Sequence, residues 1–338
     1  MDAFEVIQPG AFTTVQDLGR YGYQKYGVSI SGAMDRFALR AANLLVGNGE
    51  GEAAVEATLI GPKLKALGKL RVAFTGADLS PAVDGKPAPM WRGVDVREGG
   101  VISFGAPKSG CRAYLAIAGG IDFPIVMGSR SIHTRSNLGG NGRALAKGDL
   151  IKRKESGSGS QESGIRNQEA GIRNQESGIG VQDSGLRQIP DDEIPIYERR
   201  LTVRVVLGPQ DDYFTRKGIE TFLQSEYEIT PQADRMGYRL KGPKVEHRSG
   251  ADILTDATPP GSIQVPGDGM PIILLADGQT TGGYSKIATV TSVDQDLLAQ
   301  ARPGDKVRFQ KVTITEAHRL LREMEDRMQR IKKALIPV

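Results

Sequence analysis

The 338-residue sequence is poor in the residues on which several common chemistries depend. It has one cysteine, Cys111, so no disulfide can form within the chain, and we expect a small buried side chain there. Its three histidines, at positions 133, 247 and 318, lack the spacing of a histidine metal site. These two shortages predict a reducing, cytoplasmic compartment and no metal site.

Several familiar motifs are also missing. The sequence has no G-x-x-x-x-G-K-[ST] phosphate loop, no G-x-S-x-G nucleophile elbow and no Met-Lys-Met triplet, so we expect no covalent biotin on this chain. No stretch approaches the roughly 18 apolar residues of a membrane span, and MDAFEVIQPG lacks the pattern of a signal peptide. The net charge of +4 is too small to indicate nucleic-acid binding.

What is abundant is glycine, with 43 residues, between short runs of valine, isoleucine and leucine. That pattern, with only 6% aromatics, favours a mainly β protein, and the length favours two domains. We expect domains at 1–152 and 193–312, a linker at 153–192 and a C-terminal amphipathic helix at 313–338. The strands expected with most clarity are 70–76, 100–105, 111–120, 201–208, 262–267, 271–278 and 306–312.

The linker contains four copies of a seven-residue repeat, QESGIRN, QEAGIRN, QESGIGV and QDSGLRQ, at 161–188. A coiled coil needs two apolar positions per heptad, and these copies share one. Each copy also carries a glycine, which costs a helix about 1 kcal/mol relative to alanine. The composition therefore predicts a flexible linker, with a tether that folds on a partner as the alternative.

Three helices are expected. The first covers 35–46 with Asp35 as its N-cap, and a short second one lies near 211–223. The C-terminal helix begins with a capping box formed by Thr313 and Glu316. Its apolar stripe is expected to pack on the second domain, because such stripes usually face a core.

Candidate binding residues cluster in segments that mix glycine with polar side chains: QDLGR (16–20), GAMD (32–35), DRMGYRL (234–240), QVPGDG (264–269) and DGQTTGGY (277–284). Glycines let backbone N–H groups approach a ligand. Arg20 and Arg235 can hold a carboxylate or phosphate, and Asp17, Asp35 and Asp277 can orient a nitrogen group or act as a base. The alternatives are structural: an Arg20–Asp17 surface pair, caps by Asp17 and Asp35, and a hairpin at 277–278.

Together these segments resemble one family, that of the C-subunit of 5-oxoprolinase, also described as biotin-dependent carboxyltransferase and as allophanate hydrolase subunit 2. It is similar to half of the carboxyltransferase domain of urea carboxylase. The sequence departs from the family at Ile132 and His133, where Thr and Asp are frequent, and at Ser285, where proline is common. The resemblance also rests on AANLLVGN (41–48), RAYLAIAGGID (112–122), LGGNGRAL (138–145) and PGDKVRF (303–309).

The resemblance implies two cyclophilin-like β-barrel domains and two partners, a homologous B-subunit and an A-subunit. The complete enzyme would open 5-oxo-L-proline to L-glutamate with ATP and Mg²⁺, which we expect the B-subunit to share. Activation of a cyclic amide by phosphorylation needs positioning and charge stabilisation rather than a protein nucleophile. Two alternatives stay open: a carboxyltransferase component of a urea or amide carboxylase, and a regulatory protein that antagonises its B-subunit partner.

If the resemblance holds, Arg20 and Arg235 hold anionic groups, while Asp35 and Asp277 contact the ring nitrogen or a metal-bound phosphate. Replacing Arg235 with alanine is expected to remove turnover without unfolding the protein. The residues expected to line the substrate pocket are Gln16, Asp17, Gly237, Gln264, Gln279, Thr280, Thr281, Gly282, Gly283 and Tyr284.

Overall fold

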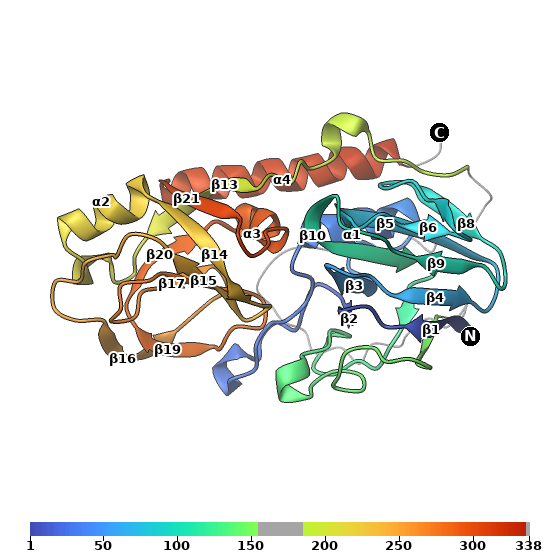
Figure 1. The fold of residues 1–338 in the computed structure, drawn as a ribbon, viewed down its shortest axis with the longest axis horizontal. Helices are drawn as coiled ribbons and strands as arrows, with labels where there is room; N and C mark the ends of the chain where they lie inside the picture. The colour runs from blue at the N-terminus through green and yellow to red at the C-terminus, as the bar shows by residue number, and fades with distance from the viewer. Residues whose placement is uncertain (155–184, 336–338) are drawn as a thin grey trace.

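A computed structural model describes residues 1–154 and 185–335 (Figure 1). Two β-rich halves lie side by side, and the C-terminal helix runs along the top of both. The repeat at 161–188 lies outside the described residues except for positions 185–188.

The first half consists of two sheets. One holds seven strands in the spatial order β11 (Ile121–Asp122), β12 (Leu150–Arg153), β1 (Asp2–Gln8), β4 (Lys63–Ala66), β9 (Val101–Ser103), β6 (Ala82–Val83) and β7 (Lys86–Pro87). The other holds five, in the order β2 (Phe12–Gln16), β3 (Ala54–Thr58), β10 (Ser109–Ile117), β5 (Leu70–Asp78) and β8 (Gly93–Val96). All their pairings are antiparallel.

The core of this half lies between the two sheets, where side chains such as Phe4, Val15 and Phe74 are buried together. The outer face of the five-stranded sheet is covered by α1 (Arg36–Leu45), and Thr75 Oγ1 of β5 donates to the carbonyl oxygen of Ala38 at 2.7 Å. Because both of its faces are covered, β5 is buried almost throughout rather than at alternate positions. Cys111 is buried, as expected, and burial raises the pKa of its thiol.

The second half is a closed seven-stranded barrel. Its strands follow the order β13 (Arg200–Leu207), β20 (Lys286–Val290), β17 (Ser262–Gln264), β18 (Ile272–Leu274), β15 (Gly237–Lys241), β14 (Glu226–Ala233) and β21 (Lys306–Lys311). Pairing is antiparallel except between β13 and β21, which are parallel. A two-stranded ribbon of β16 (Asp252–Ala257) and β19 (Thr281–Tyr284) lies beside the barrel. The prediction of a mainly β fold with a C-terminal helix is therefore confirmed.

Short helices complete the second half. The expected helix near 211–223 is in fact a 3₁₀ turn, η4 (Asp211–Tyr213), followed by α2 (Arg216–Gln224), because the Thr215 side chain caps α2 by accepting from Gly218 N. Helix α3 (Ser292–Ala299) lies at the boundary with the first half. The other 3₁₀ turns are η1 (Gln24–Tyr26), η2 (Thr134–Ser136) and η3 (Asp191–Glu193).

The C-terminal helix, α4 (Ile314–Ala334), begins as expected, with the Thr313 side chain accepting from Glu316 N. Its placement differs from our expectation of packing on the second domain. Its buried residues, Met328 and Ile331, join the apolar cluster around α1 in the first half. Its N-terminal part contacts α3, so the helix bridges both halves. The sequence shows that a stripe exists but not which core will receive it.

Residues 187–189, which we expected within the linker, pack on the first half. Gly93 N donates to the carbonyl oxygen of Arg187 at 2.8 Å, and Ile189 N donates to that of Trp91 at 3.0 Å. The Ile189 side chain is fully buried. The prediction of a flexible linker therefore fails for these three residues, whose main chain extends the five-stranded sheet beyond β8.

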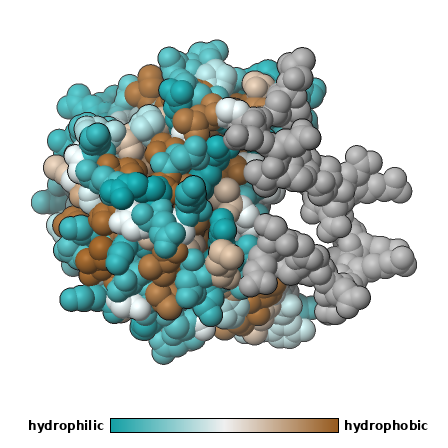
Figure 2. Space-filling view, turned by 90° about the vertical axis from the view of Figure 1, so that its right-hand side faces the viewer, coloured by the Kyte–Doolittle hydropathy of each residue, from teal (hydrophilic) through white to brown (hydrophobic). Residues whose placement is uncertain are grey.

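Within 1–154 and 185–335, no helix combines the length and apolarity needed to cross a lipid bilayer. The end face of the first half shows hydrophobic residues interspersed with hydrophilic ones rather than one extended apolar patch (Figure 2). Scattered apolar residues of this kind are normal on a protein surface.

Candidate functional site

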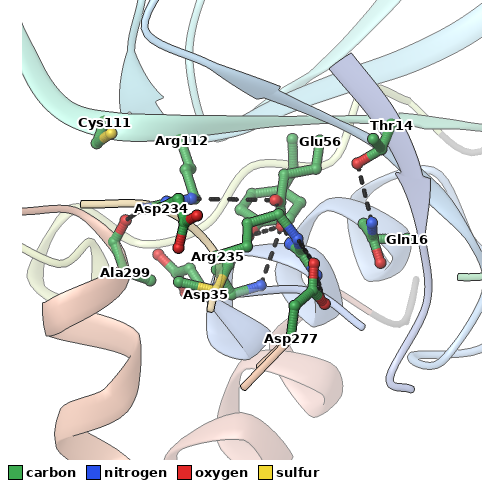
Figure 3. Close-up of polar contacts among 12 residues, drawn as sticks. Thr14, Gln16, Asp35, Glu56, Cys111, Arg112, Asp234, Arg235, Asp277 and Ala299 are labelled. Carbon is green, nitrogen blue, oxygen red and sulfur yellow. Dashed lines mark hydrogen bonds and ion pairs between the residues drawn. The ribbon is translucent and has the colours of Figure 1, made fainter. Parts of the chain in front are cut away.

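The two halves meet at a buried ionic cluster centred on Glu56 of β3, which is 1% exposed. Its Oε1 accepts from Nη1 of Arg235 at 2.6 Å, and its Oε2 accepts from the Tyr114 hydroxyl at 2.7 Å and from Met34 N at 3.0 Å. In Figure 3, Glu56, Arg235 and Asp277 point toward one another. Sequence reasoning missed Glu56, although a lone acid inside the apolar run AAVEATL was a usable signal.

Arg235 is held on all sides. Its Nε and Nη2 donate to the two carboxylate oxygens of Asp277 at 2.8 and 3.0 Å, and Nη2 also donates to the carbonyl oxygen of Gly32 at 2.6 Å. Burial opposes its charge, but Asp277 and Glu56 outweigh that effect and raise its pKa. With its donors engaged inside the protein, Arg235 acts here as a clamp between the halves, since Glu56 and Gly32 belong to the first half and Asp277 to the second.

Asp35 lies on the far side of this cluster. Its Oδ1 accepts from Ala38 N at 2.8 Å, which confirms it as the N-cap of α1. Its Oδ2 accepts from Nε2 of Gln300 at 2.7 Å and from the Tyr197 hydroxyl at 3.0 Å. Burial raises the pKa of Asp35 to about 6, against the lowering effect of these hydrogen bonds.

Arg20 is a buried cation with little compensation. Its side chain is fully buried, and its Nη2 donates to the carbonyl oxygen of Ser131. Its Nε and Nη1 have no hydrogen-bond partner among the described residues, and the same holds for Oε1 of the neighbouring Gln16. Burial lowers the pKa of Arg20 even though Asp17 and Asp277 act in the opposite direction.

Asp17 does not form the surface ion pair with Arg20 that we considered as an alternative. Its Oδ1 accepts from the hydroxyls of Ser129 and Ser131, both at 2.6 Å, and its Oδ2 accepts from Arg130 N at 2.6 Å. The carboxylate therefore fastens the loop at 129–131 against the end of β2. This organises the wall around Arg20 without neutralising its guanidinium by direct contact.

Arg20 and Asp277 are brought to the same junction by the loop before α1. Ser31 Oγ donates to Oδ1 of Asp277 at 2.8 Å, and Ser29 Oγ donates to the carbonyl oxygen of Gly278 at 2.7 Å. Nε2 of His133 lies 3.4 Å from the carbonyl oxygen of Asp277. His133, one of the departures from the family pattern, therefore faces the second half at this junction.

In the TTGGY segment, residues 281–284 form the strand β19 of the exposed ribbon. Tyr284 is 41% exposed, whereas Gln264 behind it is buried. Nε2 of Gln279 lies 3.4 Å from Oε1 of Gln264, which links the ribbon to the barrel. A Cβ at Gly282 would stand 2.4 Å from Nε2 of Gln264, so this glycine allows the close approach.

The other predicted pocket residues divide between the ribbon and the barrel wall. Thr280 holds the ribbon through its carbonyl oxygen, which accepts from Thr258 N at 2.9 Å, and Thr281 and Gly283 belong to β19 itself. Gly237 begins β15, where a Cβ would stand 2.6 Å from the carbonyl oxygen of Ile273. That position needs glycine for strand packing. The structure thus brings Gln16, Arg20 and Asp277 to one junction, with Asp35 on the opposite side of the cluster.

The described residues contain no group of three or more His, Cys, Asp or Glu side chains arranged to hold a metal ion. The junction instead offers a buried guanidinium with free donors, a free amide oxygen and surrounding hydroxyls. Such a set suits an anionic, hydrogen-bonding ligand.

Comparisons with known proteins identify relatives of this chain. Residues 26–311 match the family model of the carboxyltransferase domain, subdomain A and B. The chain is 34% identical to the C-subunit of 5-oxoprolinase from Haemophilus influenzae over 97% of both chains. It is also 34% identical to the C-subunit of 5-oxoprolinase from Escherichia coli, over 93% of this chain and 92% of that one.

Among solved structures, the urea amidolyase of Kluyveromyces lactis superposes with a TM-score of 0.86 at 31% identity. That match covers 99% of this chain and 20% of the larger protein. The shared fold, the family model and the two nearly full-length relatives lead to one conclusion: the chain belongs to the family of carboxyltransferase-domain proteins that includes the C-subunit of 5-oxoprolinase.

Proposed function

We propose that this chain is the C-subunit of an ATP-dependent 5-oxoprolinase, which opens 5-oxo-L-proline to L-glutamate together with the A- and B-subunits. Two relatives that bear the name of this subunit align with nearly the whole chain. A single reduced cysteine supports a cytoplasmic location for the complex.

The observation that carries the proposal is the buried guanidinium of Arg20. A buried charge without a partner is costly, and two of its nitrogen atoms lack an acceptor among the described residues. The carboxylate of 5-oxoproline would supply both the counter-charge and the acceptors, in the two-bond geometry that arginine favours. Gln16 would contribute its free amide oxygen to the ring N–H. Arg20 is thus assigned to substrate recognition.

The remaining junction residues position this contact. Arg235 holds Asp277 and Glu56 together, so it fixes the two halves on either side of the substrate rather than binding an anion itself. Ser31 and His133 hold the side chain and the main chain of Asp277. Gln279 and Gln264 are proposed to close the pocket from the ribbon side.

ATP would supply the phosphoryl group that activates the amide carbonyl, with Mg²⁺ as its counter-ion. The described carboxylates do not gather into a metal-binding group, so we assign Mg²⁺ and most nucleotide contacts to the B-subunit. The contribution of this chain is to bind the substrate carboxylate and to keep water away from it.

The test is glutamate release from 5-oxoproline and ATP by the three subunits together and with each left out in turn. In the complete enzyme, Arg20→Gln removes charge-assisted hydrogen bonds worth about 1.5–3 kcal/mol each, so we expect kcat/KM to fall about 10²- to 10⁴-fold. Arg97→Gln, at an exposed ion pair with Asp84, is the matched control and should change little. Activity of Arg20→Gln within threefold of wild type, or glutamate formed without this chain, would refute the proposal.

A second candidate is a carboxyltransferase component that moves a carboxyl group from biotin to urea or a related amide. The observation in its favour is 34% identity to the urea amidolyase of Lachancea kluyveri over 96% of this chain and 18% of that protein. A carboxylate on biotin would also satisfy Arg20. Urea-dependent decarboxylation of carboxylated biotin by this chain and its B-subunit, without glutamate release from 5-oxoproline, would favour this candidate.

A further inference from the structure

A cavity of about 370 Å³ opens at the boundary between the two halves. It lies where the start of α1, the segment at 195–197, α3 and α4 come together. Arg20, Glu56, Arg235 and Asp277 are not among its lining residues. Its volume is in the range of small-molecule sites. Its apolar wall is formed by Phe37, Pro195, Val293, Leu297, Leu320 and Met324.

Most charged groups on the cavity wall already have partners. Nε of Arg204 donates to Oδ2 of Asp294 at 2.9 Å. Nε of Arg327 donates to a carboxylate oxygen of Glu193 at 2.7 Å, and its guanidinium lies 4.6 Å from the centre of the Phe37 ring. The charges of these groups are therefore engaged within the protein and are not free to bind a ligand.

Glu323 is paired with Arg319, which lies outside the cavity. Arg330 is only partly engaged, because its Nη2 lies 3.4 Å from the same Glu193 that Arg327 holds more closely. It is 63% exposed at the rim. Among the described residues that line the cavity, Arg330 is therefore the cation with spare donors at the entrance.

Two carboxylates of the wall, Asp35 and Asp296, have no ion pair with any lysine or arginine side chain among the described residues. Asp35 accepts from neutral donors, and Asp296 accepts from Arg36 N at 2.9 Å. Burial, followed by the neighbouring Asp35, raises the pKa of Asp296 to about 8. The pKa of Asp35 is raised to about 6. Burial therefore favours the protonated form of these two carboxylates, and no ion pair opposes that effect among the described residues.

From this cavity and its two carboxylates without a paired cation, we infer a second binding site, for a small molecule with a primary ammonium group on a short apolar stem. The ammonium faces Asp296 and Asp35, and the stem packs on Leu297 and Met324. Arg330 at the rim donates hydrogen bonds to a carboxylate where the ligand is an amino acid. The site spans both halves and α4, and it does not depend on the proposed catalytic role.

Binding should release a proton. The ammonium donates hydrogen bonds to an ionised carboxylate, so a protonated Asp296 must lose its proton when the ligand enters. Affinity therefore rises with pH below the pKa of Asp296, by up to tenfold per pH unit, and levels off above it.

Other titratable and charged groups face the two carboxylates. The Tyr197 hydroxyl stays neutral because burial raises its pKa well above 10. The charged groups that face the pair from the elements packed against it are Arg36, Glu56, Arg204, Asp294, Glu323, Arg327 and Arg330. The part of the pH dependence that Asp296→Asn removes therefore reports on Asp296.

The experiment is calorimetric titration of the purified chain with n-butylammonium and, separately, with L-norvaline. Each is run between pH 6.5 and pH 8.5 in two buffers of different ionisation enthalpy, which reports proton release. We expect saturable binding of at least one probe, proton release near pH 7, and at least tenfold weaker binding in Asp296→Asn. Asparagine keeps an oxygen acceptor for Arg36 N, so a purely structural role of Asp296 would leave binding unchanged.

Two further variants complete the test. Asp326→Asn removes the same charge from an exposed position of α4 and should bind like wild type. Val293→Phe fills the cavity without altering any charge and should abolish binding. Tighter binding of norvaline than of butylammonium would identify an amino acid as the ligand class, and the reverse a simple amine. No saturable binding of either probe below about 10 mM, affinity independent of pH, or unchanged binding in Val293→Phe would overturn the inference.

Discussion

Arg235→Ala is the perturbation for which the structure changes our expectation most. From the sequence we expected loss of turnover without unfolding. In the structure this side chain is the only cation bonded to the buried carboxylates of Glu56 and Asp277 among the described residues, apart from Arg112 at 4.0 Å from Glu56. Removal of one partner of a buried ion pair typically costs about 3–5 kcal/mol, because a buried charge is left without compensation.

Here two carboxylates lose their main partner and the carbonyl oxygen of Gly32 loses a donor, so we expect a cost at the upper end, about 4–5 kcal/mol. For 338 residues, an unfolding entropy of about 2.1 cal/mol/K per residue means that each kcal/mol shifts the melting temperature by about 1.4 °C, which gives a fall of about 6–7 °C. Differential scanning calorimetry measures this shift. Arg97→Ala, at an exposed pair, is the control and should cost less than about 1 kcal/mol.

A double variant separates the ion pair from other contacts. If uncompensated charge is the cause, Arg235→Met combined with Glu56→Gln should be more stable than Arg235→Met alone, since one orphaned carboxylate is removed. A melting temperature for Arg235→Ala equal to that of Arg97→Ala would refute the view of Arg235 as a clamp between the halves. So would a double variant whose losses simply add.

Three further predictions test other parts of the structure. Gly237→Ala places a Cβ 2.6 Å from the carbonyl oxygen of Ile273, so it should destabilise the barrel by about 1–3 kcal/mol in urea unfolding. Normal stability together with weaker substrate binding would instead indicate that Gly237 lines the substrate pocket. Met328→Ala should lower the free energy of unfolding by about 2–5 kcal/mol, because Met328 is fully buried against the first half. Leu321→Ala, at a 37% exposed site, should change it by less than about 1 kcal/mol. Equal effects of the two substitutions would contradict the observed packing of α4. The folded-state pKa of Asp296 lies above its unfolded value, so its contribution to stability is largest at low pH and is lost as pH rises from about 4 to about 8. The Asp296→Asn variant should therefore gain stability relative to wild type between pH 5 and pH 8. Parallel pH profiles of melting temperature for the two proteins would contradict this.

The sequence predicted local features well where one residue type has one local use. Asp35 and Thr313 were identified as helix caps because their side chains satisfy backbone N–H groups within three residues. Strand existence was also predictable from short apolar runs between glycines. Strand ends were less so: the strands expected at 262–267 and 271–278 are shorter, Ser262–Gln264 and Ile272–Leu274, and Pro266 follows the first of them, where proline cannot donate to a ladder.

The candidate site was only partly predictable. Arg20 and Asp17 are close in sequence, which suggested a surface pair, but the loop at 129–131 takes up Asp17 and leaves Arg20 buried with free donors. The apolar neighbours of Glu56 on β3 marked it as unusual, but its partner Arg235 is 179 residues away, so the sequence did not show what the carboxylate is for. Partners at such separation leave no periodic signal in a single sequence.

The sequence by itself determined the β-rich composition, the local caps, the glycines that permit close approach, and the family motifs that span most of the chain. The tertiary structure alone decided which buried charges are compensated, which half receives α4, and that a cavity with two carboxylates lies apart from the Arg20 junction. The reason is physical. Propensities and caps act over a few residues, whereas the cost of a buried charge depends on every group that surrounds it in space.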